Sequence, residues 1–129
     1  MWNTILFSTL LGSAAALTYS AVRAVWIFRQ PVDSPDLKKI SGFVADGAMA
    51  FLSREYAALL PFVLVVAGFL YLGQRGPLRF QSLSFLLGAG CSGLAGFVGM
   101  RVATAANART TQAAEKGINP ALKVAFSGG

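Results

Sequence analysis

Five acidic side chains are the residues best suited to metal binding or acid–base chemistry: Asp33, Asp36, Asp46, Glu55 and Glu115. They are scattered along the chain, and no two of them form a paired motif. The sequence has no phosphate-binding glycine loop, and it has no His that could activate a nucleophile. We therefore expect no catalytic, cofactor-binding or metal-binding residue in these 129 residues.

The individual acidic residues have simpler interpretations. Asp33 and Asp36 are expected at the start of a helix, where a negative charge is favourable. Asp46 could pair with a cation, and a role in ion passage is the alternative. Glu55 is expected at the membrane surface together with Arg54. Cys91 has no second Cys to pair with, so we expect a small packed side chain.

The composition excludes an ordinary soluble domain. The chain is 55% hydrophobic and 12% charged, with a net charge of +6, whereas about 25% of residues are charged in a typical soluble domain. The charges avoid the long apolar runs and gather between them. This pattern indicates membrane topology and argues against a soluble nucleic-acid binder.

Three uncharged runs are long enough to cross a bilayer, for which about 20 residues suffice. They are Trp2–Val22 with 21 residues, Tyr56–Gln74 with 19 and Phe80–Met100 with 21. A secretory signal peptide is the alternative for the first run, but no Lys or Arg precedes it, which favours a retained span. We expect an all-α membrane protein, with helices near 2–28, 35–74 and 78–116 and a fourth beginning near 120.

Proline and glycine residues predict where these helices begin and end. Ser34 followed by Pro35 indicates a helix start that runs continuously into the second span, with a modest kink at Pro61. The segment 73–77 predicts a tight turn. Gly117 is expected to end the third helix, and Asn119 to cap the fourth, with Pro120 at its first position.

Small residues line one side of the third span. Gly88, Ser92 and Gly96 recur every four residues, with Gly93 beside them. Such residues let helix backbones approach closely in a membrane. We expect this face to pack against other helices.

The basic residues predict an orientation. Nine cations fall in the segments after the first and third spans, and two, Arg75 and Arg79, fall between the second and third. Cytoplasmic loops carry the excess of Lys and Arg. The N-terminus and the turn near Gln74 are therefore expected outside.

The residues from Gly47 to Tyr56 and from Gly88 to Met100 resemble the second and third spans of the membrane-bound, ion-translocating inorganic pyrophosphatases. The resemblance continues through Ala103-Thr104, Asn107 and Arg109-Thr110 to the final glycines, and covers roughly Asp36 to Gly129. The third-span block with its polar tail is its specific part. The first span is similar only in position and character.

The resemblance implies a pump of roughly sixteen spans with an outward N-terminus, which acts as a homodimer. Such a pump hydrolyses magnesium pyrophosphate, sometimes with K⁺, and moves H⁺ or Na⁺ outward. The family's metal- and pyrophosphate-binding motifs lie further along and are not in this sequence. No active-site residue can be transferred to any position here.

We therefore interpret the chain as the truncated N-terminal portion of such a pump, serving as scaffold and inactive alone. Arg101, Arg109 and Lys116 could attract pyrophosphate, but attraction without metal-held water is not catalysis. The alternative is a complete small multi-pass membrane protein with a structural or accessory role.

Overall fold

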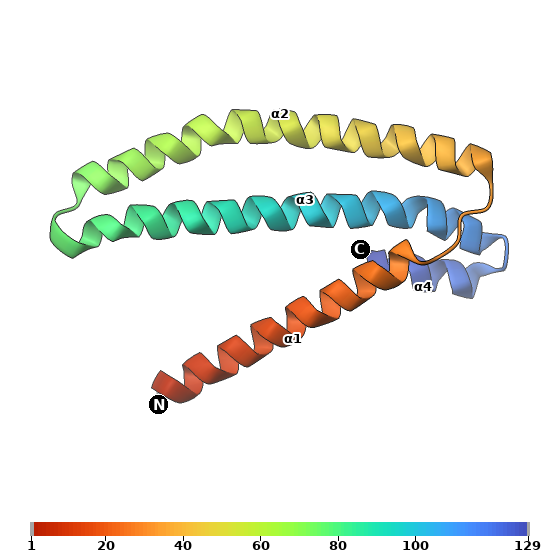
Figure 1. Ribbon diagram of the computed structural model, residues 1–129, viewed down its shortest axis with the longest axis horizontal. Helices are drawn as coiled ribbons and strands as arrows, with labels where there is room; N and C mark the ends of the chain where they lie inside the picture. Colours follow the sequence, from red (N-terminus) through yellow and green to blue (C-terminus); the bar gives the residue numbers. More distant parts are fainter. Residues whose placement is uncertain (1, 129) are drawn as a thin grey trace. The chain divides into compact units, whose positions relative to one another are not determined.

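Four α-helices make up most of the computed structural model, which describes residues 2–128. Their order is α1 (Trp2–Phe28), α2 (Pro35–Gly73), the short 3-10 helix η1 (Gly76–Arg79), α3 (Phe80–Ala114) and α4 (Ile118–Gly128), and the described residues contain no strand (Figure 1). Trp2–Phe28, Pro35–Gly73 and Gly76–Ala114 are long and apolar enough to cross a membrane. The predicted fold class, with three membrane-length helices, is confirmed.

The start of α2 forms as the Ser34-Pro35 pair predicts. The backbone N–H of Leu37 donates to Ser34 Oγ at 3.4 Å, and the N–H of Lys38 donates to the Ser34 carbonyl at 3.2 Å. Pro35 occupies the first position of the helix, where its missing N–H costs nothing. The helix then continues through Pro61 without a break, so the second span and the segment before it form one helix, as expected.

The turn between α2 and α3 is held by side chains from both of its sides. Gly76 has a φ of +64°, a left-handed conformation that glycine adopts at little cost. Arg79 Nε donates to the Gln74 carbonyl at 3.1 Å, and its guanidinium lies 5.3 Å from the centre of the Tyr71 ring. Gln74 Nε2 also donates to Gln81 Oε1 at 2.8 Å. This short connection turns the chain back, so that α3 runs antiparallel to α2 within residues 42–101.

The expected cap of the fourth helix is wrong by two residues. α4 begins at Ile118, not after Asn119, and the Gly117 carbonyl accepts the N–H of Ala121 at 3.4 Å. Gly117 has a φ of +122° and makes the turn out of α3. Asn119 and Pro120 therefore lie inside the first turn of α4, where proline is still tolerated because the N–H groups there have no partner within the helix.

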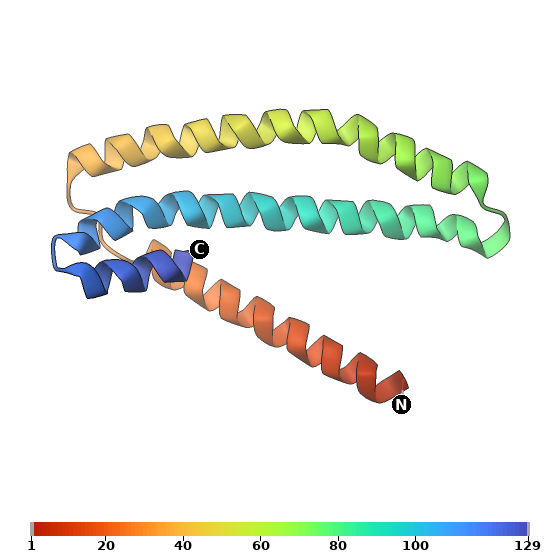
Figure 2. The same ribbon diagram turned by 180° about the vertical axis from the view of Figure 1, so that it is seen from behind.

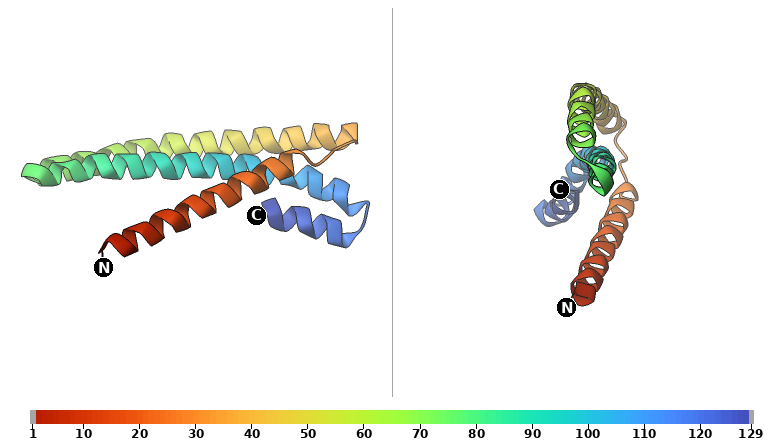
Figure 3. Two further views of the ribbon diagram at one scale, coloured as in Figure 1. Left: turned by 60° about the horizontal axis from the view of Figure 1, so that its bottom comes forward. Right: turned by 90° about the vertical axis from the view of Figure 1, so that its left-hand side faces the viewer.

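The chain divides into two compact units. One consists of residues 42–101, in which α2 and α3 lie side by side (Figure 3). The other combines residues 2–41 with 102–128, and there α4 runs beside the end of α1 (Figure 2). The buried apolar residues of this latter unit are Ile27, Ala106, Ala108, Ala121 and Val124. Its small core is built mainly from alanines, which allow close helix contact.

Most large apolar side chains of the membrane-length helices are exposed. Phe7 is 70% exposed, Phe69 73% and Leu72 78%. Cys91 is exposed as well, so the described residues do not cover it, and its expected packing stays a prediction. Such a surface is suited to lipid or to further helices, not to water.

Candidate functional site

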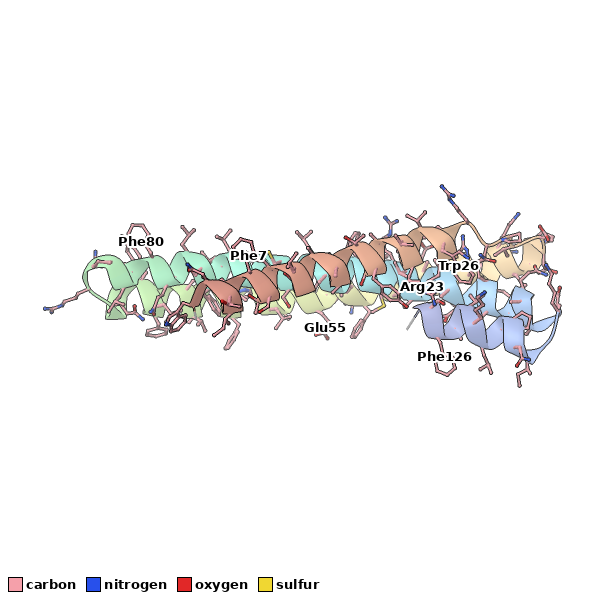
Figure 4. The ribbon with its side chains drawn as sticks, turned by 90° about the horizontal axis from the view of Figure 1, so that it is seen from below. Phe7, Arg23, Trp26, Glu55, Phe80 and Phe126 are labelled. Carbon is pink, nitrogen blue, oxygen red and sulfur yellow. The ribbon has the colours of Figure 1, made fainter. Side chains whose placement is uncertain are left out.

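The acidic residues do not come together. All five carboxylates lie on exposed residues, and Glu55 is seen on α2 in Figure 4. Across residues 2–128, no three His, Cys, Asp or Glu side chains are placed so that they could hold a metal ion. Mg²⁺ is bound through carboxylate oxygens together with substrate phosphates and water. The described residues therefore bring no cluster of carboxylates together.

Arg109 instead connects the end of α3 to the end of α1. Its Nη1 donates to the Ala105 carbonyl at 2.8 Å, and its Nη2 donates to the carbonyl of Phe28, the last residue of α1, at 3.2 Å. The guanidinium also lies 5.5 Å from the centre of the Phe28 ring. A cation at a helix C-terminus satisfies carbonyls that have no partner within the helix and complements the helix dipole. Arg109, part of the polar tail seen in the sequence, thus fixes the end of the first span.

Gln112, one turn further along α3, holds the connector that follows. Its Oε1 accepts the backbone N–H of Asp33 at 3.1 Å and that of Ser34 at 3.3 Å, and its Nε2 donates to Glu115 Oε2. Two successive turns of α3 therefore position the end of α1 and the start of α2.

A basic pocket of about 450 Å³ opens beside these contacts. Arg109, Lys116 and Lys123 supply its positive charges, and no Asp or Glu is among the described residues that line it. The remaining lining residues are amides and apolar groups: Gln30, Gln112, Asn119, Trp26, Pro31, Ala113, Pro120 and Val124. Below, this cavity is called the basic pocket.

Trp26 forms part of the wall of the basic pocket and lies between two cations. Arg23 lies 5.6 Å from the centre of the Trp26 ring and Lys123 Nζ lies 5.9 Å from it, while Arg23 is also 5.6 Å from the centre of the Tyr19 ring. Arg23 and Trp26 are labelled near the end of α1 in Figure 4. Aromatic and basic residues in this arrangement are typical of the membrane–water interface.

The unit of residues 42–101 contains a notch in the glycine-rich face of α3. Tyr56 Oη donates to the Gly93 carbonyl at 2.6 Å. A Cβ added at Gly96 would lie 2.8 Å from the same Oη, so only glycine leaves room for the hydroxyl there. Gly88, Gly90 and Gly99 have nothing within 4 Å of an added Cβ. The expected close packing is therefore present at Gly93 and Gly96, and the described residues leave the rest of the face uncovered.

Sequence reasoning missed the roles of Gln112 and Lys123. An isolated Gln carries no motif, and its two backbone partners lie almost eighty positions away along the chain. Lys123 counted only as one cation of a basic segment. The sequence contained one indication of the pocket: Arg109 and Lys116 both follow the apolar span Phe80–Met100.

Comparisons with known proteins agree with this architecture. The profile of the family described as "Inorganic H+ pyrophosphatase" matches residues 14–129. A putative K(+)-stimulated pyrophosphate-energized sodium pump of Clostridium tetani is 37% identical over 131 residues, covering 100% of this chain and 19% of that protein. The K(+)-stimulated pyrophosphate-energized sodium pump of Thermotoga maritima is 40% identical over 116 residues, covering 88% of this chain and 16% of that protein.

One relative named as a proton pump has a sequence identity to this chain close to that of the two sodium pumps. The K(+)-insensitive pyrophosphate-energized proton pump of Caldanaerobacter subterraneus is 36% identical over 116 residues, covering 81% of this chain and 16% of that protein. The chain thus spans less than a fifth of the length of these curated relatives. The matched profile covers most of the chain, and the membrane-length helices agree with it: the chain belongs to the inorganic H+ pyrophosphatase family.

Proposed function

We propose that these residues form the scaffold helices of a membrane pump that couples pyrophosphate hydrolysis to the outward movement of H⁺ or Na⁺. The observation that carries the proposal is the family profile over residues 14–129, combined with three membrane-length helices. The relatives are named sodium pumps in two cases and a proton pump in the third, so the proposal includes both ions.

The contacts of the described residues support a scaffold role. Arg109 and Gln112 join helix ends, and Tyr56 joins two spans, whereas no carboxylates gather among residues 2–128. In this proposal Mg²⁺, and K⁺ where it is needed, bind outside this segment. The whole protein is an integral membrane homodimer whose N-terminus faces outward, in the plasma membrane if the source is prokaryotic.

The test is phosphate release from pyrophosphate with excess Mg²⁺. The product of the complete reading frame that contains these residues is compared with residues 1–129 alone, both in liposomes. We expect magnesium-dependent hydrolysis and ion movement from the former and neither from the latter, because five scattered carboxylates cannot hold metal-bridged pyrophosphate for attack by water.

Two results would contradict the proposal. Absence of hydrolysis by the complete product would remove the pump function and favour an accessory membrane protein. Magnesium-dependent turnover by residues 1–129 alone would refute the scaffold role, and it would direct attention to Asp46 and Glu55, whose D46N and E55Q variants would then be assayed.

A further inference from the structure

The lining of the basic pocket is positively charged and favours a negatively charged ligand. Arg109 lies on α3, Lys116 in the turn after α3, and Lys123 on α4. Three amide side chains, Gln30, Gln112 and Asn119, also line the pocket, and no carboxylate is among the described lining residues. Gln30 Nε2 donates to the Trp26 carbonyl and Gln112 Nε2 to Glu115, which lies beside the lining, so the lysines and the Arg109 guanidinium carry the attraction for an anion. The first turn of α4, which includes Asn119 and Pro120, adds the positive end of a helix dipole.

The three cations of the basic pocket differ in how many contacts they make with other residues of the protein. Two nitrogens of Arg109 donate to backbone carbonyls, and its Nε is buried without a partner. This fixes one positive charge in the wall. Lys116 and Lys123 are exposed residues, and Lys123 Nζ lies over the Trp26 ring. The flexible lysines can therefore close on an anion that enters beside the fixed guanidinium.

The position of the pocket along the chain indicates its depth in the membrane. Trp26 follows the uncharged run Trp2–Val22 by four residues, and Arg23 follows it directly. Tryptophan and snorkelling cations mark the level of lipid headgroups. The apolar part of the lining, which includes Val124 and Pro31, is suited to the glycerol region of a lipid.

We propose that the basic pocket binds a phosphate group. At this depth an anionic phospholipid headgroup is the source that the position favours, and free phosphate or pyrophosphate presents the same chemistry. A zwitterionic headgroup is a poor ligand because its ammonium group would face three cations. This proposal rests on membrane insertion and on the pocket itself, and it is independent of the proposed pumping function.

The experiment uses native mass spectrometry of the complete reading-frame product in nonionic detergent. Phosphatidylglycerol and phosphatidylcholine are titrated separately, and inorganic phosphate and pyrophosphate are added in parallel samples by calorimetry without lipid. The test variant is K116A/K123A. The matched control is K38A/K39A, which removes two exposed lysines near the start of α2 that do not line the pocket.

In the parent protein and in K38A/K39A, we expect phosphatidylglycerol to bind with similar affinity and phosphatidylcholine to bind weakly. K116A/K123A should lose the tightest-bound phosphatidylglycerol, with an affinity loss of roughly fivefold for each lysine removed. K116R/K123R keeps both charges and should bind as the parent does, which separates loss of charge from loss of fold.

The two anion sources give different results. Loss of lipid binding assigns a headgroup, whereas loss of phosphate or pyrophosphate binding with unchanged lipid binding assigns a free anion. If K116A/K123A and K38A/K39A bind every probe alike, the basic pocket is not a phosphate site and the proposal is overturned. Hydrolytic activity is not the readout, so the outcome is separate from that of the pump assay.

Discussion

Among single residues, the clearest relation is between Tyr56 and Gly96. The Tyr56 hydroxyl donates to the Gly93 carbonyl at 2.6 Å and occupies the space in which a side chain at Gly96 would begin. The reason for glycine at this position is the neighbouring oxygen and not the backbone conformation, which is ordinary helix. The contact joins a tyrosine at the entry of one span to the glycine-rich face of the next.

Gly96→Ala should destabilise the protein by about 1 kcal/mol relative to Gly88→Ala, because the added methyl displaces the Tyr56 hydroxyl. Gly88→Ala is the matched control, since it makes the same change in the same helix with nothing within 4 Å. Unfolding of the purified complete product in detergent measures both.

A thermodynamic cycle separates this contact from helix propensity. In a Tyr56→Phe background the oxygen is absent, and the difference between Gly96→Ala and Gly88→Ala should shrink toward zero. Tyr56→Phe alone should cost about 0.5–1 kcal/mol through the lost hydrogen bond. An undiminished difference in the Tyr56→Phe background would mean that the notch does not depend on the hydroxyl.

Arg109 acts through geometry as well as charge. Its planar group donates to two carbonyls and lies over the Phe28 ring at the same time, and a lysine ammonium has no rigid fork of donors to keep all three contacts. Arg109→Lys should therefore cost about 1–2 kcal/mol of stability, although the charge is kept. Arg29→Lys, an exchange at an exposed residue, should be neutral, and the thermal unfolding midpoints of the two variants make the comparison. Equal midpoints would show that only the charge of Arg109 matters.

At the scale of the helices, proline and glycine residues explain where most helices begin and end. Pro35 and Gly76 fall where a helix starts and where the chain turns. The fourth helix starts earlier than expected because Gly117, with its positive φ, both ends the turn and provides the first accepting carbonyl. A proline in the first turn is compatible with either start, so its position alone could not decide between them.

Over the described chain as a whole, exposed apolar surface dominates. Large apolar side chains remain exposed along all three of its membrane-length helices. Such a surface can contact the lipid of a bilayer or further membrane helices. Apolar exposure does not indicate which end of each helix faces the cytoplasm, and that orientation can be measured.

The excess of cations after the first and third spans predicts that Gln74 faces outward and Lys116 faces the cytoplasm. In a Cys91→Ser background of the complete product, with any other cysteines removed, a membrane-impermeant maleimide should label Gln74→Cys in intact cells. It should label Lys116→Cys only after the cells are opened. The reverse pattern would invert the topology.

Local patterns in the amino-acid sequence were sufficient to predict the membrane class, the three spans and their main limits, whereas the family came from a resemblance to known sequences. Uncharged runs of about 20 residues favour helices in lipid, because a helix gives every backbone polar group a partner within the same segment. Proline, glycine and serine act on their immediate neighbours. Because these effects are local, they can be recognised without knowing how the chain folds back on itself.

Which distant residues meet could be learned from the three-dimensional arrangement alone. Tyr56 pairs with Gly93 across 37 positions, and Arg109 reaches Phe28 across 81. The basic pocket likewise collects Trp26, Arg109 and Lys123 from three helices. Such contacts depend on how helices pack and rotate against one another, and the small residues that permit close approach recur along several faces of a helix. The packing of specific side chains, not their spacing in the sequence, selects one face.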